Sequence, residues 1–105
     1  MGTRARFSPR AIADLDSIRE YLLPHSPQGA ESVRLAIAET IALLEQFPGA
    51  GRKSTINGVR VIPVVRYHYL IYHKVGTDDL LILHIRHGAR RVPERGEMEV
   101  SSRGA

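Results

Sequence analysis

Apolar residues recur at steps of three and four in two long segments of the first half of the chain. In the first segment they are Ala11, Ile12, Leu15, Ile18 and Leu22. This spacing places them on one face of an amphipathic helix, with Asp14, Asp16, Arg19 and Glu20 on the opposite, polar side. Ser8 is a favoured N-cap, and Pro9 suits the first helical position because its missing N–H would have no partner there. The pattern predicts a helix that begins at Pro9 and is ended by Pro24.

A second helix is predicted directly after the first. Ser26-Pro27 repeats the same start signal, and Phe47-Pro48-Gly49 provides an end. The apolar stripe between them consists of Ala30, Val33, Ile37, Ile41 and Leu44. Because the linker between the two helices is short, we expect an antiparallel helical hairpin with both stripes facing one surface.

The second half of the chain changes to the pattern of β-strands. Turn signals at Asn57-Gly58 and at residues 76–79 separate segments rich in β-branched and aromatic residues. Strands are predicted at residues 4–7, 59–65, 67–75 and 80–87. Pro63 predicts a bulge or an edge position within its strand, because proline cannot donate a hydrogen bond to a neighbouring strand.

The order strand, helix, helix, strand, strand, strand predicts an α+β fold. In this fold a small, mainly antiparallel sheet carries the α-helical hairpin on one face. A chain of 105 residues has room for one domain, which we place at residues 1–93, with a polar C-terminal tail at residues 94–105.

Composition excludes several classes of protein. There is no cysteine, which removes disulfides, thiolate metal sites and a cysteine nucleophile. No apolar run is long enough to cross a membrane, and the N-terminus lacks the apolar core of a signal peptide. We therefore expect no membrane association and a cytoplasmic location.

Positive charge is concentrated in the middle of the chain. Residues 52–91 contain eight Lys and Arg against two Asp, a net charge of +6, whereas residues 1–51 and 92–105 each carry −1. Concentrated positive charge attracts nucleic acid or an acidic protein surface. The segment predicts a basic face or edge, with a solvated rim as the alternative.

Four histidines, His68, His73, His84 and His87, lie within twenty residues of one another. On a strand His84 and His87 would point to opposite faces, as would His68 and His73, so neither pair forms a local chelate. A cross-strand pair such as His68 with His84 stays possible, but no carboxylates accompany it. We expect no metal site and no cofactor.

Recognisable catalytic motifs are absent from the sequence, which has no G-x-S-x-G, P-loop or H-E-x-x-H. A ribonuclease needs less, because a general base, a general acid and cations that stabilise the phosphate suffice. The candidates for that chemistry are Arg60, Arg66, Arg86 and His87. The tyrosines Tyr67, Tyr69 and Tyr72 are interpreted as packing residues of the sheet in preference to platforms for stacked bases.

Several motifs in the same order resemble the RelE/ParE toxin superfamily across nearly the whole chain. They are Ser8-Pro9-Arg10-Ala11, Asp14-Leu15, Ile18, Tyr21, Leu44, Phe47-Pro48, Gly51-Arg52, Gly58-Val59-Arg60, Tyr69, Ile71-Tyr72 and Ile85-Arg86-His87-Gly88-Ala89-Arg90-Arg91. The ending at residues 87–91 is most similar to the ParE branch. The resemblance implies a small sheet with a helical hairpin, in agreement with the pattern of the sequence.

The resemblance implies two activities of different classes. ParE-like toxins poison DNA gyrase through protein contact and need no catalytic residues, whereas RelE-like toxins cut messenger RNA on the ribosome. RelE-like nucleases have an aromatic residue near the C-terminus, but this chain has no Tyr or Phe after Tyr72. We therefore favour a gyrase inhibitor of a plasmid-stabilisation type over an endoribonuclease, with a non-toxic antitoxin-binding module as a third reading.

The resemblance also implies a cognate antitoxin, with a ribbon-helix-helix DNA-binding domain and a segment that covers the toxin in a hetero-oligomer. An acidic covering segment would match the basic residues 52–91. The expected contacts with antitoxin or target are Arg52, Lys53, Arg60, Arg66, Arg86, His87, Arg90 and Arg91.

Exchanging Arg60, Arg66 or Arg86 for Glu is expected to weaken antitoxin binding and to reduce its dependence on salt, because each exchange removes an ionic contact that salt screens. Titration calorimetry at low and high ionic strength measures both quantities. Unchanged affinity and unchanged salt dependence in all three variants would contradict the contact role.

Overall fold

The computed structural model describes residues 3–88. Its elements are β1 (Arg4–Phe7), α1 (Pro9–Leu22), α2 (Pro27–Gln46), β2 (Arg52–Lys53), β3 (Arg60–Val64), β4 (Tyr69–Val75) and β5 (Asp79–His87). The predicted order of elements is confirmed, with the two-residue strand β2 as an addition. The predicted C-terminal tail and the contact residues Arg90 and Arg91 lie outside the described residues.

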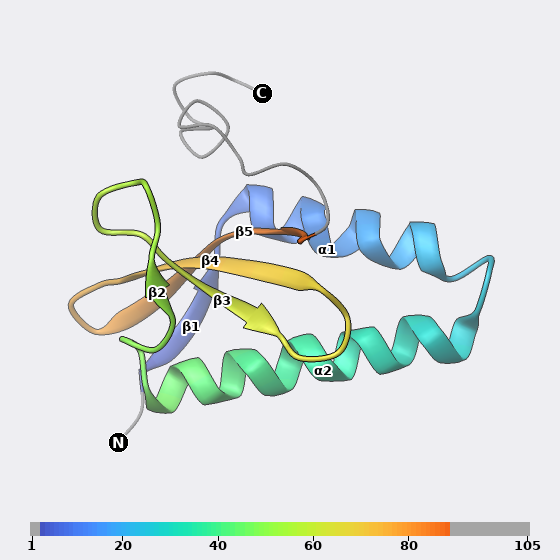
Figure 1. The fold of residues 1–105 in the computed structure, drawn as a ribbon, viewed down its shortest axis with the longest axis horizontal. Helices are drawn as coiled ribbons and strands as arrows, with labels where there is room; N and C mark the ends of the chain where they lie inside the picture. The colour runs from blue at the N-terminus through green and yellow to red at the C-terminus, as the bar shows by residue number, and fades with distance from the viewer. Residues whose placement is uncertain (1–2, 89–105) are drawn as a thin grey trace.

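Both helices begin as their capping residues predict. The Ser8 hydroxyl accepts a hydrogen bond from the Ala11 N–H at 3.0 Å, and the Ser26 hydroxyl accepts one from the Gly29 N–H at 2.9 Å. The two helices run antiparallel and project together past the end of the sheet (Figure 1). Neither helix of the described part is long and apolar enough to span a membrane.

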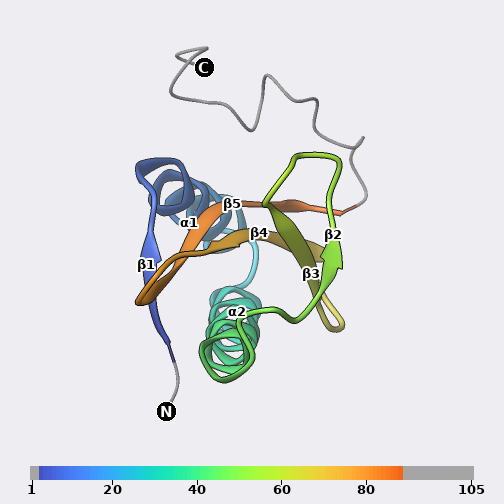
Figure 2. The same ribbon diagram turned by 90° about the vertical axis from the view of Figure 1, so that its left-hand side faces the viewer.

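The sheet has the strand order β1-β5-β4-β3-β2. The chain meanders through β3, β4 and β5 in antiparallel pairs, while β1 lies parallel to β5 at the edge, with Arg4 opposite Asp79 and Phe7 opposite Ile82. Seen end-on, the sheet curls and α2 lies inside the curve, whereas α1 lies beside β5 (Figure 2). This is the α+β arrangement that the sequence predicts.

The main core lies between the helical hairpin and the sheet. The predicted stripe of α2 is buried and packs with inward residues of β3, β4 and β5, among them Val64, Ile71 and Ile82. A second, smaller cluster contains Val59, Val61 and Tyr72. Side chains of neighbouring residues on a strand alternate between faces, so the sheet has apolar residues on both of its faces.

The pairing of β4 with β5 contains an irregularity. Tyr72 lies opposite His84 and His73 opposite Ile82, which leaves Leu83 as an extra residue on β5. Such a bulge interrupts the alternation of side chains and re-aims those beside it. Pro63, by contrast, pairs regularly with Leu70, beyond the end of β2, so its predicted edge position is confirmed.

The turn between β3 and β4 corrects one predicted boundary. We expected a strand from Tyr67, but β4 begins at Tyr69, because the chain reverses through residues 65–68. Arg66 and His68 adopt positive φ angles of 86° and 59°, a conformation that is costly for residues other than glycine. The reversal is held by the Gly88 N–H, which donates to the His68 carbonyl.

His73 is fully buried, and neither of its ring nitrogens has a hydrogen-bond partner among the described residues. Burial and, second, the charge of Arg60 lower the pKa of this imidazole below its ordinary 6.5. The nearby Ala50 backbone opposes this shift without reaching hydrogen-bonding geometry. The neutral ring is therefore favoured, and the buried polar atoms are left unsatisfied.

Replacing His73 by Leu is expected to stabilise the fold by about 1–3 kcal/mol, because it removes a buried polar group that lacks a partner. Because the pKa of His73 is lower in the folded state, protonation favours the unfolded chain. The stability of the wild type is therefore fully present above about pH 6.5 and decreases as the pH falls towards the folded-state pKa of His73. The variant lacks this part of the pH dependence. Thermal unfolding at about pH 7.5 and about pH 5.5 measures both effects; a lower melting temperature for the variant at the higher pH would contradict the expectation.

Candidate protein interface

Three of the candidate contact residues lie at the β2–β3 edge of the sheet, namely Arg52, Lys53 and Arg60. Arg52 and Lys53 are exposed on β2, and Lys53 lies opposite Arg60 of β3. The Arg60 guanidinium donates to the Gly51 carbonyl at 3.2 Å. Part of the hydrogen-bonding capacity of Arg60 is thus satisfied within the chain, while its neighbours on β2 remain accessible.

Arg66 lies at the other end of β3, in the turn that leads to β4. Arg60 is the first of the five residues of β3, and at a rise of about 3.3 Å per residue a strand of this length spans roughly 15 Å. Arg66 is exposed and forms no ion pair within residues 3–88. The basic segment is therefore divided between two ends of the sheet.

Arg86 and His87 are neighbours at the end of β5 and project to opposite sides of it. The Arg86 guanidinium donates to the Tyr72 hydroxyl at 3.4 Å and to the His87 carbonyl at 3.2 Å. The His87 ring instead meets Tyr69 edge-on, with centroids 5.3 Å apart. The two side chains that the sequence pairs as cation and acid do not converge on one point.

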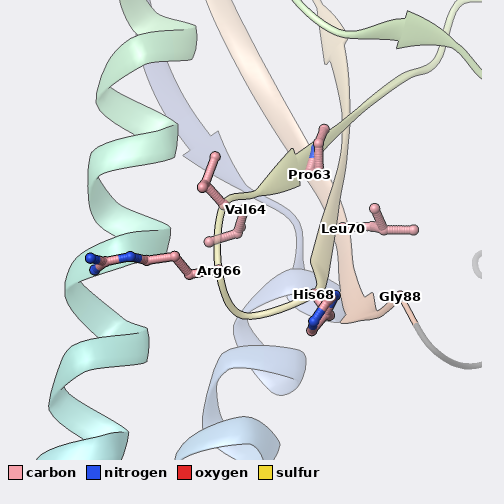
Figure 3. A pocket seen from close by; sticks show the side chains of 7 residues that line it. Pro63, Val64, Arg66, His68, Leu70 and Gly88 are labelled. Carbon is pink, nitrogen blue, oxygen red and sulfur yellow. The ribbon is translucent and has the colours of Figure 1, made fainter.

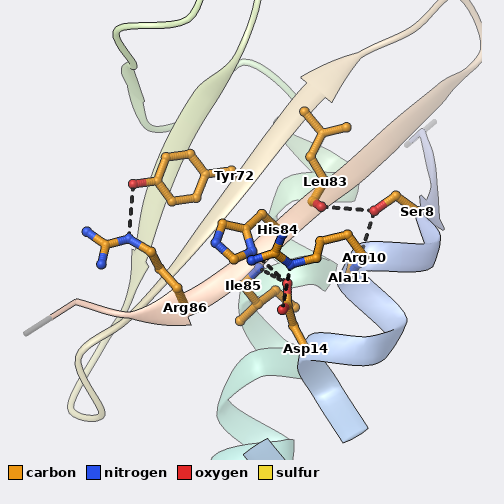
Figure 4. Close-up of polar contacts among 9 residues, drawn as sticks. All are labelled: Ser8, Arg10, Ala11, Asp14, Tyr72, Leu83, His84, Ile85 and Arg86. Atoms are coloured by element: carbon orange, nitrogen blue, oxygen red, sulfur yellow. Dashed lines mark hydrogen bonds and ion pairs between the residues drawn. The ribbon is translucent and has the colours of Figure 1, made fainter. Parts of the chain in front are cut away.

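A line of polar side chains crosses from α1 to the outer side of the sheet (Figure 4). The Asp14 carboxylate lies 2.7 Å from His84 Nδ1 and accepts the Ile85 N–H at 2.9 Å. The His84 ring stacks on Tyr72 with centroids 5.7 Å apart, and the Tyr72 hydroxyl accepts from Arg86. This line connects the first helix to the candidate residue Arg86.

Burial alone would raise the pKa of the Asp14 carboxyl. The contact with His84 and the hydrogen bond from Ile85 outweigh burial, with a smaller contribution from Arg10, and they hold the pKa below its ordinary 3.8. Asp14 therefore stays ionised as an acceptor for a backbone N–H and a histidine at once.

The sequence missed this arrangement. Asp14 was expected on the polar side of the first helix, but its side chain is half-buried against β5. The Arg10–Asp14 pair at 3.2 Å has the spacing of an ordinary surface ion pair, so helical periodicity gave no signal. His84 could not be placed either, because the bulge at Leu83 decides which side of β5 it takes.

The tyrosines pack as interpreted. Tyr69 and Tyr72 are buried, and the partly buried Tyr67 packs against the main core, which agrees with a packing role. Among residues 3–88 no three side chains of His, Asp or Glu come together in a group that could hold a metal ion.

An open hollow of about 390 Å³ lies beside the β3–β4 turn (Figure 3). Its lining residues are Pro63, Val64, Val65, Arg66, His68, Leu70 and Gly88. The lining is mainly apolar, and Val65 is 75% exposed. A side chain at Gly88 would come within 2.8 Å of the His68 carbonyl, so the close approach that shapes this end of the sheet requires glycine.

Comparison with known proteins covers most of the chain. Residues 5–92 match the family model described as the ParE toxin of the type II toxin–antitoxin system parDE. Toxin RelE2 of Caulobacter vibrioides is 34% identical over 83 residues, which are 77% of this chain and 90% of that protein. Y4kP of Sinorhizobium fredii is 28% identical over 91 residues, 87% of this chain and 94% of its own length.

A solved structure agrees with these matches. A chain of the chromosomal ParDE TA system from P. aeruginosa superimposes with a TM-score of 0.73 and 28% sequence identity. The match covers 81% of this chain and 95% of that chain. The α+β fold described above is thus shared with a chain of a solved ParDE system.

Exchanging Asp14 for Ala is expected to lower the free energy of unfolding by about 1.5–3 kcal/mol, because the Ile85 N–H and His84 lose a charged acceptor. Since the folded pKa of Asp14 is lowered, its contribution is present above about pH 4 and is lost as the pH falls through the folded value. Urea unfolding at about pH 7 measures the loss. The control is Asp16→Ala, at an exposed position of the same helix, with an expected change within about 0.5 kcal/mol; equal effects of both exchanges would contradict the role of Asp14.

Proposed function

Since the chain belongs to the ParE toxin family of type II toxin–antitoxin systems, we propose that it stops growth by binding DNA gyrase in the cytoplasm and that a cognate antitoxin neutralises it. In this proposal the chain acts through protein contact. It carries out no reaction of its own, and its basic residues are contact residues.

The separation of the candidate catalytic residues is the observation that carries this proposal. Arg60 and Arg66 flank opposite ends of β3, and Arg86 and His87 project to opposite sides of β5. A general base, a general acid and a phosphate-stabilising cation must all reach one phosphate group. The four candidates do not surround such a point in the described residues, which favours a binding surface over a nuclease site.

The end of the sequence supports the same choice. The resemblance associates ribosome-dependent nucleases with an aromatic residue near the C-terminus, and this chain has no Tyr or Phe after Tyr72. The relatives carry both RelE and ParE names, so names alone leave the target undecided. An endoribonuclease of the RelE type is the second candidate.

Neutralisation follows from the same surface. The basic side chains of β2 and of the β3–β4 turn are exposed, and an acidic antitoxin segment would pair with them and block the approach of a target. Binding to the folded toxin alone would also stabilise it. The proposal therefore includes a hetero-oligomer with an antitoxin whose DNA-binding part is a ribbon-helix-helix dimer.

Induction of the chain alone in bacteria tests the target. If gyrase is inhibited, incorporation of labelled thymidine falls before incorporation of labelled methionine, and the cells become filaments with a DNA-damage response. Co-induction of the antitoxin is the control and should restore both rates.

An earlier fall in methionine incorporation would contradict the gyrase proposal in favour of the nuclease, with Arg86 and His87 as the first residues to exchange. Undisturbed incorporation of both labels would leave the chain as an antitoxin-binding module without toxicity.

A further inference from the structure

The hollow beside the β3–β4 turn places an apolar lining next to Arg66, and the proposed function uses only the charge of Arg66. Its lining is mainly apolar, with Pro63, Val65 and Leu70 among the lining residues and His68 as a polar one. Its rim carries Arg66, which has no ion pair in the described part of the chain. None of the described residues that line it carries a carboxylate, so this part of the surface combines apolar side chains with a cation.

The backbone of the turn beside the hollow is strained. Arg66 and His68 both have positive φ angles, and strained conformations of this kind persist where the surrounding structure fixes them, often at binding sites. In Figure 3 the Arg66 side chain extends from the turn on the side of α2, whereas His68 and Leu70 lie on the other side of the turn. A ligand that uses both features has to cross the turn.

The edge of β3 limits what can dock there. The Val59 carbonyl accepts a hydrogen bond from the Ser54 N–H, on the side of β2. Backbone carbonyls of successive strand residues point to opposite sides. The Pro63 carbonyl, four residues later, therefore points to the same side as that of Val59, beyond the end of β2. Proline offers this open edge an acceptor but no donor. An incoming segment therefore gains little from strand pairing and must be held mainly by its side chains.

A second copy of this chain fits the hollow poorly. The Arg66 side chains of the two copies would repel each other if they met, and a second β3 edge with Pro63 would again lack a donor. An acidic segment has the complementary charge, and the partner that the family implies is the antitoxin.

We propose that the hollow anchors the antitoxin, which inserts one apolar side chain between Pro63, Val65 and Leu70 and places a carboxylate from a few residues away on Arg66. This inference rests on the proposed function, because it names the part of the surface that the antitoxin uses. It places the apolar anchor of the antitoxin at the β3–β4 turn, in addition to the pairing of charges proposed for β2.

Two exchanges at exposed positions test the anchor. Val65→Asp puts a negative charge into the hollow, and Arg66→Glu reverses the charge at the rim. The matched controls are Ile12→Asp and Arg19→Glu, which put an acid in place of an apolar and of a basic side chain at exposed positions of α1. The affinity of each full-length variant is measured for the product of the neighbouring gene that restores growth when co-induced.

Both hollow variants are expected to raise the Kd at least about tenfold, while the controls stay within about threefold of the wild type. Arg66→Glu should also reduce the salt dependence of binding. Circular dichroism of each variant verifies that the fold is unchanged. In the absence of antitoxin, Val65→Asp should still stop growth, because the anchor serves neutralisation.

Wild-type affinity in both hollow variants would overturn the proposal. Loss of toxicity with unchanged antitoxin affinity would also overturn it, since the hollow would then belong to the target contact. A concentration-dependent dimer of the wild type that Val65→Asp abolishes would assign the hollow to a second copy. If no neighbouring gene product binds the wild type, the proposed function fails together with the anchor, whereas the other outcomes refute the anchor alone.

Discussion

Parallel pairing of the first strand with the last is the constraint on which the rest of the fold depends. β1 lies beside β5 in the same direction, so the chain must return across the sheet before the meander of β3, β4 and β5 can form, and the helical hairpin makes this return. Because β1 ends opposite Ile82, α1 continues along the free edge of β5. There Ser8 donates to the Leu83 carbonyl and Asp14 accepts from the Ile85 N–H.

Carboxylates of the two helices each accept a backbone N–H at this side of the sheet. Glu45 of α2 accepts the Ala5 N–H of β1 at 2.8 Å, as Asp14 of α1 accepts from β5. An open strand edge invites pairing with other chains, and these two acceptors occupy that edge from within. At the opposite edge β2 has two residues, and Pro63 of β3 lies beyond its end, so part of that edge stays open.

The placement of charge relates this architecture to function. Arg60 and Arg86 have acceptors within the chain, whereas Arg66 is held outward by a strained turn. Cations spread over separate parts of a sheet suit contact with an extended partner more than catalysis at one phosphate. The same turn lies beside an apolar hollow, so binding energy and charge recognition are available together at one end of the molecule.

The sequence by itself determined the elements and the fold class, because periodicity and end signals act locally: Ser8-Pro9 and Ser26-Pro27 begin the helices where predicted, and the alternating segments became strands. It also identified the basic segment and the family resemblance. Only the tertiary structure decided where those cations lie, since the register of β4 and β5 and the bulge at Leu83 depend on contacts between distant residues. For the same reason, the spacing of residues along the sequence did not predict the burial of Asp14 or the lack of hydrogen-bond partners for the His73 ring among the described residues. A carboxylate or imidazole on one helix or strand takes its role from the strand packed against it.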